Sequence, residues 1–437
     1  MKILITGLAL SRNLGAPAMA LSLITEIGKK FPNAIFTMAV SSTDMEQELK
    51  WLKYYQDMGF QIEKLVPRST ITSYIINKIP IKKIYQLITG KYKLPAYKNQ
   101  KDRKYWLDQH KKFISEIKES DLVISMYGIS YVGDGVHKVT DGLSDYSPFY
   151  YAKKYSVPYT RFIQSYGPFN DYKIKFFAKK ELNSLPFIYA RGKNSASYCR
   201  EIVKNKSKVF DVPDLAILLN KADDMWTQQF LKDIDFKEKE YVIISPSAVI
   251  YAMPKKVTGS IGEKHIESVV LIVKELLKEG NKILLLPHMY SDKKWECDRE
   301  ICFKILEKLA IKEKQSLQIV VDDIDAMQAK SLIASSKLAI VSRYHALVAA
   351  VSTSTPVITI GWNIKYYDLM EYFCIEDMAI DTRDNMPKEI LNQVIKKRKF
   401  YANKKNLLVY KIMKQRVEEK VLNAVDNLNN WITDATR

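Results

Sequence analysis

The chain has 437 residues, of which 47% are hydrophobic and 11% aromatic, and its formal net charge is +19 at pH 7. This length exceeds one ordinary core and suits two domains, and the composition indicates a globular protein and excludes a disordered one. The positive charge favours acidic partners, namely phosphorylated or carboxylated small molecules, anionic lipid or nucleic acid.

Neither the cysteines nor the N-terminus indicate an exported or membrane-spanning protein. The four cysteines have no CxxC spacing and predict free thiols in a reducing cytosol. The first twenty residues resemble a secretory signal, but Gly7 interrupts the apolar run. In addition, Arg12 and Asn13 lie in the region that would precede the cleavage site, which is uncharged in signal peptides. No window approaches the ~20 apolar residues of a membrane span. We therefore expect a cytoplasmic protein.

Short apolar runs alternate with longer amphipathic stretches, which predicts βαβ units around parallel sheets. The predicted strands are KILITG, AIFTMAV, QIEKLV, DLVISM, YTRFIQS and FIYAR in the first half, and YVIIS, KILLLP, LQIVV, LAIVS, PVITI and MAID in the second. Residues 262–279 show helical spacing most clearly, and their apolar positions are Ile266, Val269, Val270, Val273, Leu276 and Leu277. Gly280-Asn281 is predicted to end this helix.

The polar stretch 220–240 separates two such series. We predict a Rossmann-like domain over 1–222, a second over 238–385 and a basic helical segment over 388–437. Residues 68–118 depart from the alternation and are predicted to be an insertion, with thirteen Lys or Arg against three Asp or Glu. This insertion is either a solvated helical face, a membrane-docking surface, or a binding site for anionic glycan. Because no nucleic-acid module is recognised, we predict no nucleic-acid partner.

Polar residues and glycines follow several predicted strands, at the sheet edge where open α/β proteins bind ligands. They are Asn13 and Gly15, then Gly128, Ser130 and Asp134, then Gln164, then Arg191 and Ser195, and finally His288. The first of these turns is neither a GxGxxG motif nor a P-loop, so a nicotinamide or ATP site is not indicated. Glycines needed only for a tight turn remain an alternative there.

The stretch LAIVSRYHALVAA, residues 338–350, is the sharpest candidate site. Ser342 is predicted to be the N-cap of a helix over 343–352, whose first N–H groups could bind an anion. Arg343 supplies a planar fork suited to phosphate or carboxylate, and histidine is a common proton donor near neutral pH, which makes His345 a candidate acid. The alternative is a core histidine beside a surface arginine.

Metal and covalent chemistry are not indicated. The five histidines show no HxxxH or Cys/His ligand spacing, and there is no GxSxG elbow. The sequence therefore predicts neither a metal site nor a cofactor.

Taken in order, these stretches resemble the polysaccharide pyruvyl transferase family from residue 1 to about 385. The matching elements are ITGLALSRNLGAPAMAL, DLVISMYGISYVGD, QSYGPF, YARGKNSASY and SRYHALVAAVSTSTPVITIGW. The chain departs from the family pattern at Ala16-Pro17, where an Asp-Glu pair is usual, and at Arg191-Gly192, where an Arg-Asp pair is common.

The resemblance implies a GT-B-like α/β fold, with two facing Rossmann-like domains, parallel sheets and a C-terminal helical segment. The implied activity is transfer of pyruvate from phosphoenolpyruvate to two hydroxyls of a sugar in a surface polysaccharide or its lipid-linked precursor, which forms a cyclic ketal. The 238–385 domain would bind the donor, and the insertion would lie on the acceptor side. Independently of the resemblance, we expect a cytoplasmic protein whose basic segments allow peripheral contact with anionic lipid at the inner face of the membrane.

The resemblance also implies a role for each candidate residue. His345 would be the acid, with Arg343 and Arg191 as anion binders. Donor binding would use Ser342, Arg343, His288 and Ser195, and acceptor binding would use Asn13, Gly15, Gly128, Ser130, Asp134 and Gln164. Phosphoenolpyruvate would be a co-substrate, and no cofactor or metal would be needed.

Two other functions remain open. A GT-B glycosyltransferase would place the phosphates of a nucleotide sugar at the same helix terminus, because fold alone does not decide function. A non-catalytic protein could instead use the basic segments to bind a membrane surface. Donor binding separates the first alternative from pyruvyl transfer, and vesicle binding tests the second.

Overall fold

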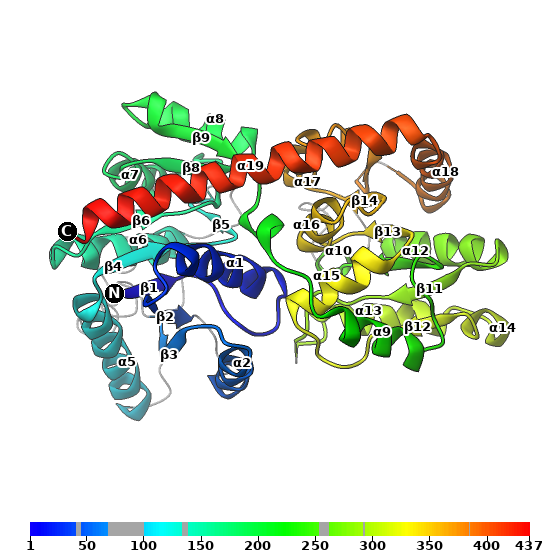
Figure 1. Ribbon diagram of the computed structural model, residues 1–437, viewed down its shortest axis with the longest axis horizontal. Coiled ribbons are helices and arrows are strands. Elements are labelled where there is room, and N and C mark those ends of the chain that lie inside the picture. Colours follow the sequence, from blue (N-terminus) through cyan, green and yellow to red (C-terminus); the bar gives the residue numbers. More distant parts are fainter. Residues whose placement is uncertain (41–44, 69–99, 133–138, 253–261, 292, 384) are drawn as a thin grey trace. The chain divides into compact units, whose positions relative to one another are not determined.

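The computed structural model describes residues 1–40, 45–68, 100–132, 139–252, 262–291, 293–383 and 385–437, which form two compact units (Figure 1). The first unit comprises Met1–Ser11, Leu23–Val212 and Leu422–Arg437, and the second comprises Arg12–Ser22 and Pro213–Val421. Each unit has its own parallel sheet, as the alternating pattern predicted. Among the described residues, no helix is long and apolar enough to cross a membrane.

The sheet of the first unit has five parallel strands in the order β3-β2-β1-β4-β6. Their bounds are β1 (Lys2–Thr6), β2 (Ile35–Val40), β3 (Ile62–Pro67), β4 (Leu122–Ser125) and β6 (Tyr159–Arg161). The helices along this part of the chain are α1 (Gly15–Lys30), α2 (Met45–Asp57), α5 (Gln100–Glu119), α6 (Val139–Lys154), α7 (Tyr172–Leu182) and α8 (Lys193–Ile202). Successive residues of β1 are buried, as expected for a parallel strand covered on both faces.

Two short parallel pairs extend this unit. They are β5 (Ile129–Ser130) with β7 (Ser165–Tyr166), and β8 (Ile188–Arg191) with β9 (Val209–Val212). The single strand predicted over YTRFIQS is therefore wrong, because β6 and β7 belong to different sheets. Ile163, between them, has a φ of 31°, and a left-handed residue there turns the chain out of the extended conformation.

The second unit contains a six-stranded parallel sheet in the order β12-β11-β10-β13-β14-β15. The strands are β10 (Tyr241–Ser245), β11 (Lys282–Leu285), β12 (Leu317–Ile319), β13 (Leu338–Val341), β14 (Val357–Gly361) and β15 (Ala379–Asp381). The strand order reverses between β10 and β13, which is the topological switch point where open α/β sheets bind ligands.

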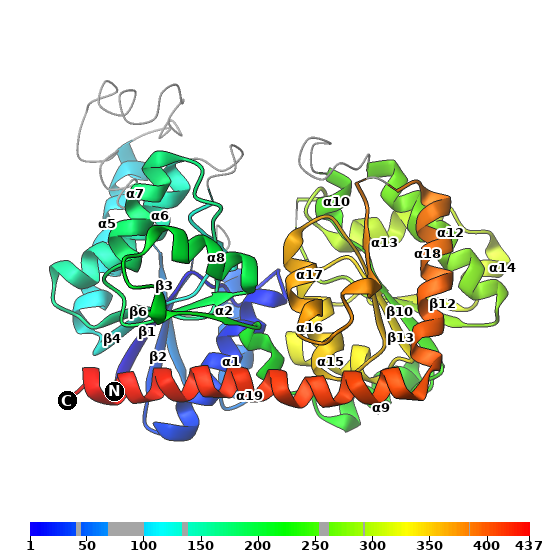
Figure 2. The same cartoon turned by 90° about the horizontal axis from the view of Figure 1, so that it is seen from above.

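Helices cover this second sheet, with α16 and α17 on one side and α12 and α18 on the other (Figure 2). The helices of this part of the chain are α9 (Asp224–Asp233), α10 (Ala248–Ala252), α12 (Gly262–Lys278), α13 (Asp298–Glu307), α14 (Ile311–Lys314), α15 (Ala326–Ser335), α16 (Tyr344–Ser352), α17 (Ile364–Glu371), α18 (Pro387–Arg398) and α19 (Lys404–Ala435).

Helix α12 shows how the sequence pattern produces the core of the second unit. Its buried apolar residues include Ile266, Val269, Val270, Val273 and Leu276, the positions that helical spacing predicted. They pack in one cluster with residues of β10, β11 and β13. Burying each such side chain contributes about 1.5–3 kcal/mol, so this stripe holds the helix on the sheet.

The two units do not coincide with the ranges 1–222, 238–385 and 388–437. Residues 213–222 belong to the second unit, where Lys330 of α15 donates to the carbonyls of Ile217 and Leu219. The turn Arg12–Ser22 also belongs to the second unit, whereas Leu422–Arg437 belongs to the first. Helices α1 and α19 therefore each contribute to both units. Within the basic segment 68–118, residues 69–99 lie outside the described part, and the remainder is mainly α5.

Candidate active site

The SRYH stretch joins β13 to α16 at the switch point of the second sheet. The Ser342 N–H donates to the carbonyl of Ser245 (2.8 Å), so Ser342 continues the pairing of β13 with β10. The helix begins at Tyr344, and its N-cap is Arg343, in extended conformation with no side-chain capping bond. The prediction that Ser342 is the N-cap is therefore wrong, because strand pairing extends one residue further than the apolar run suggested.

Arg343 is oriented by a buried carboxylate, Asp298 at the start of α13. Its Nε lies 3.0 and 2.8 Å from the two Asp298 carboxylate oxygens, and its Nη2 donates to Asp298 Oδ1 and to the carbonyl of Glu296 (3.4 Å). Within the described part of the chain, the hydrogen bonds that Arg343 donates to Asp298 and Glu296 come from Nε and Nη2. The side chain keeps 17% exposure, and a guanidinium suits phosphate or carboxylate.

Asp298 is itself fixed by backbone donors and was not predicted. It is fully buried and also accepts hydrogen bonds from the N–H groups of Ala248 (2.8 Å) and His288 (3.2 Å). One carboxylate thus links the loops that follow β10 and β11 to the arginine that follows β13. Its neighbourhood in sequence, SDKKWECDRE, holds many charges and gave no signal that this aspartate is the buried one.

His345 has a carboxylate partner of its own. Its Nε2 lies 3.6 Å from Oδ2 of Asp214, which is fully buried, while the imidazole is 18% exposed. The other Asp214 oxygen accepts from the Ala216 N–H (2.8 Å) and caps a 3-10 turn, η2 (Leu215–Leu218). A carboxylate at this distance attracts a protonated imidazole. Asp214 was also missed, because it lies far from His345 in sequence.

The N-terminal turn lies against the same histidine. Asn13 forms an antiparallel bridge with Met289, and the Leu14 N–H donates to the carbonyl of His288 (3.2 Å). Asn13 Oδ1 accepts from the Gly15 N–H (3.0 Å). A Cβ atom on Gly15 would lie 1.9 Å from Nδ1 of His345, so only glycine allows this approach. The second unit thus brings together Asn13, Gly15, His288, Ser342, Arg343 and His345.

His288 and His265 are buried neutral groups. Burial lowers the pKa of His288 to about 3, with further lowering from His345 and Arg343. Burial likewise lowers the pKa of His265 to about 4, assisted by Arg343. His288 Nδ1 lies 3.3 Å from the Ser245 hydroxyl. Because both imidazole rings are neutral, a structural role is favoured for His288 and His265. Neither ring adds positive charge beside Arg343.

A small cavity of about 20 Å³ lies beside His345, with room for about one water molecule. Its lining includes Leu14, Ala18, Ala216, His288, Lys330 and His345. Lys330 Nζ donates to the carbonyls of Ile217 (3.0 Å) and Leu219 (2.7 Å), and burial lowers the pKa of Lys330 to about 7. These bonds hold the segment that follows Asp214, so Lys330 supports the carboxylate that faces His345.

The remaining candidates gather in the first unit. Arg191 ends β8, and it donates through Nε to the Ser165 hydroxyl (3.0 Å) and through Nη2 to the carbonyl of Gly128. Ser195 Oγ accepts from the Tyr166 N–H (2.6 Å), and Gln164 Oε1 accepts from the Tyr127 N–H (2.9 Å). Asp134 lies outside the described residues.

Ser130, a predicted acceptor contact, instead serves a buried ion pair. Arg161 and Glu181 are fully buried and paired through Arg161 Nε, and Arg161 Nη1 donates to the Ser130 hydroxyl (3.0 Å). The hydroxyl of Tyr159 donates to Glu181 (2.6 Å). A buried pair of this kind is kept only when its remaining donors and acceptors are satisfied, and Ser130 contributes to that.

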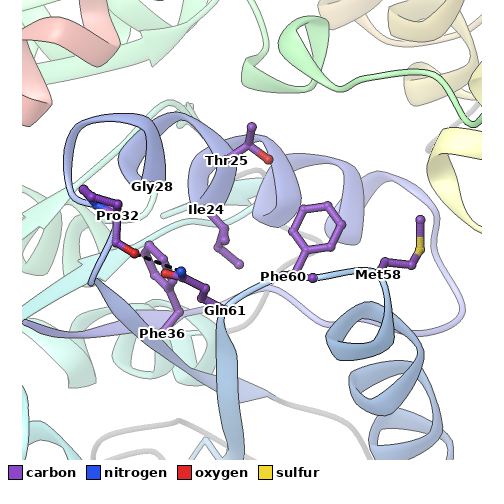
Figure 3. Close-up of a pocket in the computed structure, with 9 residues that line it drawn as sticks. Ile24, Thr25, Gly28, Pro32, Phe36, Met58, Phe60 and Gln61 are labelled. Atoms are coloured by element: carbon purple, nitrogen blue, oxygen red, sulfur yellow. Dashed lines mark hydrogen bonds between the residues drawn. The ribbon is translucent and has the colours of Figure 1, made fainter.

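The groove in Figure 3 belongs to the first unit and has a volume of about 270 Å³. It lies at the amino-terminal ends of β2 and β3, where Gln61 Nε2 donates to the carbonyl of Pro32 (2.9 Å). The predicted polar residues follow carboxyl ends of strands, so none of them lines this groove. In the described part of the chain, no group of three or more His, Cys, Asp or Glu side chains could hold a metal ion.

Replacement of Gly15 tests the contact with His345. Gly15→Ala is expected to displace the imidazole, because the new Cβ would lie 1.9 Å from Nδ1, and to reduce activity at least about tenfold. Gly28→Ala is the matched control, since the same helix leaves open space there and alanine is the better helix former by about 1 kcal/mol. The activity and the midpoint of urea unfolding are measured for Gly15→Ala and for Gly28→Ala. Equal activity of the two variants would contradict the contact.

The buried histidines predict that acid destabilises the fold. The folded-state pKa of His265, about 4, lies below the ordinary value of 6.5, so the unfolded chain binds a proton that the folded chain does not. This contribution is complete above about pH 6.5 and is lost as pH falls toward 4, of the order of 3 kcal/mol at most. Urea unfolding of wild type and His265→Gln between pH 7.5 and 4.5 should show a shallower pH dependence in the variant. If the free energy of unfolding of His265→Gln fell with pH as steeply as that of wild type, His265 would not be a buried neutral histidine.

Solved structures of other proteins have the same α/β architecture with two parallel sheets. The Neisseria meningitidis UDP-GlcNAc 2-epimerase bound to UDP-GlcNAc matches with a TM-score of 0.58 and 10% identity, over 99% of this chain and 100% of that one. Anabaena Alr3699/HepE in complex with UDP and glucose matches with a TM-score of 0.54 and 11% identity, also over 99% and 100%. These likenesses show the fold alone, a GT-B-like α/β fold with two parallel sheets. No curated protein sequence matches the chain.

The family follows from a sequence model. The model of the polysaccharide pyruvyl transferase family, described as "Polysaccharide pyruvyl transferase", matches residues 13–364, which is most of the chain. The chain therefore belongs to the polysaccharide pyruvyl transferase family, an enzyme family. The match begins at Asn13 and includes Asp214, Asp298, Arg343 and His345.

Proposed function

We propose that the protein transfers pyruvate from phosphoenolpyruvate to two hydroxyls of a sugar, forming a cyclic ketal. The acceptor would be a surface polysaccharide or its lipid-linked precursor. The observation that carries the proposal is that two side chains at the end of β13 each lie beside a buried carboxylate: Arg343 is paired with Asp298, and His345 Nε2 lies 3.6 Å from Asp214 Oδ2. An anion binder next to a proton donor suits a substrate that carries phosphate and must be protonated on carbon.

In this proposal Arg343 binds the donor through the side of its guanidinium that Asp298 leaves open. Asp298 holds the guanidinium plane in place before the donor arrives, and such preorganisation avoids reorientation during the reaction. Arg191 in the first unit is proposed as a further anion binder. Its Nε donates to the Ser165 hydroxyl and its Nη2 to the carbonyl of Gly128, which orient the guanidinium.

His345 would place a proton on the methylene carbon of phosphoenolpyruvate, converting it to a methyl group and leaving an oxocarbenium-like centre at the adjacent carbon. One sugar hydroxyl adds to that carbon, phosphate leaves with its bridging oxygen, and the second hydroxyl adds to close the ring. The two hydroxyl protons balance the one placed on carbon and the one carried away by phosphate. Asp214 stabilises the protonated His345 and its orientation, as a carboxylate does for catalytic histidines generally.

Calorimetry with the purified full chain tests this function. Phosphoenolpyruvate is titrated beside UDP-galactose and CMP-sialic acid, and each titration is repeated with Arg343→Ala and Arg191→Ala. Saturable phosphoenolpyruvate binding that Arg343→Ala abolishes supports the proposal. Binding of a nucleotide sugar alone would identify a glycosyltransferase instead. Unchanged phosphoenolpyruvate binding in Arg191→Ala would remove that arginine from the donor site.

A further inference from the structure

The start of helix α19 is apolar on two opposite faces. On the inner face, Tyr410 and Val417 are buried, and the Tyr410 hydroxyl donates to the carbonyl of Thr355 (3.0 Å), which holds this part of the helix in the second unit. On the other side, Leu408 is 59% exposed, Val409 41% and Ile412 42%. An amphipathic helix of a globular protein normally carries polar residues opposite its packed face, so these three residues need an explanation.

Helical geometry shows that the exposed residues form one patch. Leu408 and Ile412 are four residues apart and lie one above the other, and at about 100° per residue they point away from Tyr410. Val409 flanks them. No described residue buries this outer face, which we call the Leu408 surface, defined by Leu408, Val409 and Ile412.

The charged residues that flank the Leu408 surface along the chain, from 396 to 416, are all positive. Residues 396–416 contain nine Lys or Arg and no Asp or Glu. Lys404, Lys405, Lys411 and Arg416 are exposed on the same helix. A second copy of the chain seated on this surface would bring two such sets of positive charge together, which is unfavourable. A partner that complements both the apolar residues and the positive charges has an apolar interior beneath a negatively charged surface.

We propose that the Leu408 surface docks on a lipid bilayer that contains anionic headgroups. The apolar side chains would enter the boundary between headgroups and acyl chains, and the surrounding lysines would contact the negative headgroups. The contact is peripheral, since no described helix is long and apolar enough to span the membrane. The inference does not depend on the proposed function, because it uses none of the residues at the end of β13.

Vesicle flotation with the full chain tests the proposal. Vesicles of phosphatidylcholine alone are compared with vesicles that also contain phosphatidylglycerol, at low and high salt. We expect binding to the mixed vesicles only, and weaker binding at high salt because screening reduces the attraction. Equal binding to both vesicles, or none to either, would overturn the proposal.

Two sets of substitutions separate the apolar and the charged contribution. Leu408→Ser with Val409→Ser and Ile412→Ser should reduce binding at least about tenfold, and Lys404→Gln with Lys405→Gln and Lys411→Gln should remove its salt dependence. All six side chains are exposed, so the substitutions should leave the fold intact. Circular dichroism checks this. Ile311→Ser with Lys312→Gln and Lys314→Gln is the matched control, since Ile311 is 84% exposed on α14. Equal losses in the control would overturn the assignment.

A spectroscopic readout locates the contact independently of affinity. Leu408→Trp should shift its fluorescence to shorter wavelength on addition of the mixed vesicles, because the indole leaves water. Ile311→Trp should not. Sedimentation equilibrium without vesicles tests the other occupant: a dimer that the Leu408, Val409 and Ile412 substitutions dissociate would assign this face to a second copy and refute the bilayer proposal.

Discussion

Loss of Arg343 is expected to abolish phosphoenolpyruvate binding and transfer, and also to weaken the fold. Arg343→Ala removes the anion binder and leaves the carboxylate of Asp298 buried without its cation, although the N–H groups of Ala248 and His288 remain. Removing one partner of a buried ion pair typically costs about 3–5 kcal/mol. Calorimetry and urea unfolding measure the two effects separately.

A double variant distinguishes loss of binding from loss of stability. Arg343→Met with Asp298→Asn removes both charges and keeps much of the volume, so most of the stability should return while donor binding stays absent. Arg343→Lys keeps the charge but cannot form the bidentate contact with Asp298, so we expect weakened binding at nearly normal stability. If the double variant bound phosphoenolpyruvate as wild type does, Arg343 would not be the anion binder.

Loss of His345 is expected to abolish turnover while donor binding is largely retained. His345→Gln keeps a polar side chain near Asp214 but cannot deliver a proton at neutral pH, and losing a general acid typically costs about 10²–10⁴-fold in kcat. Asp214→Asn should lower kcat less, because the histidine remains but loses the charge that stabilises its protonated form. Steady-state kinetics with phosphoenolpyruvate measures both variants.

His110 provides the matched control for His345. It lies in α5 of the first unit, where its Nε2 is 3.0 Å from the Tyr151 hydroxyl, and burial lowers its pKa to about 4. His110→Gln should affect stability but not kcat. Near wild-type turnover in His345→Gln would remove this residue from the acid role, whatever the result for His110.

Several parts of the architecture could be predicted because their signals are local. The apolar stripe of α12 follows from helical spacing alone, and β1, β10 and β13 follow from short apolar runs. The sheet edge that carries the polar residues could also be predicted, since residues directly after a buried strand lie at the carboxyl edge of a parallel sheet. Arg343 and His345 follow a predicted strand in this way, and their roles stay predictions.

The partners of those residues could not be predicted. Asp298 and Asp214 lie 45 and 131 residues from Arg343 and His345, and nothing near them in sequence distinguishes them from the many solvated carboxylates of the chain. The start of α16 was placed one residue early for a related reason, because pairing of Ser342 with Ser245 is a contact between strands. Likewise, Ser130 looked like a ligand contact, but it satisfies the buried Arg161.

Residue type and spacing along the chain were enough to predict the alternation of strands and helices, the family, and an arginine and a histidine after β13 as candidate site residues. Three features follow from the folded chain and not from local pattern: the Arg12–Ser22 turn packs in the second unit, position 15 must be glycine to admit His345, and Arg343 and His345 each have a buried carboxylate beside them. The physical reason is that burial and ion pairing depend on distances through space, which local periodicity does not encode.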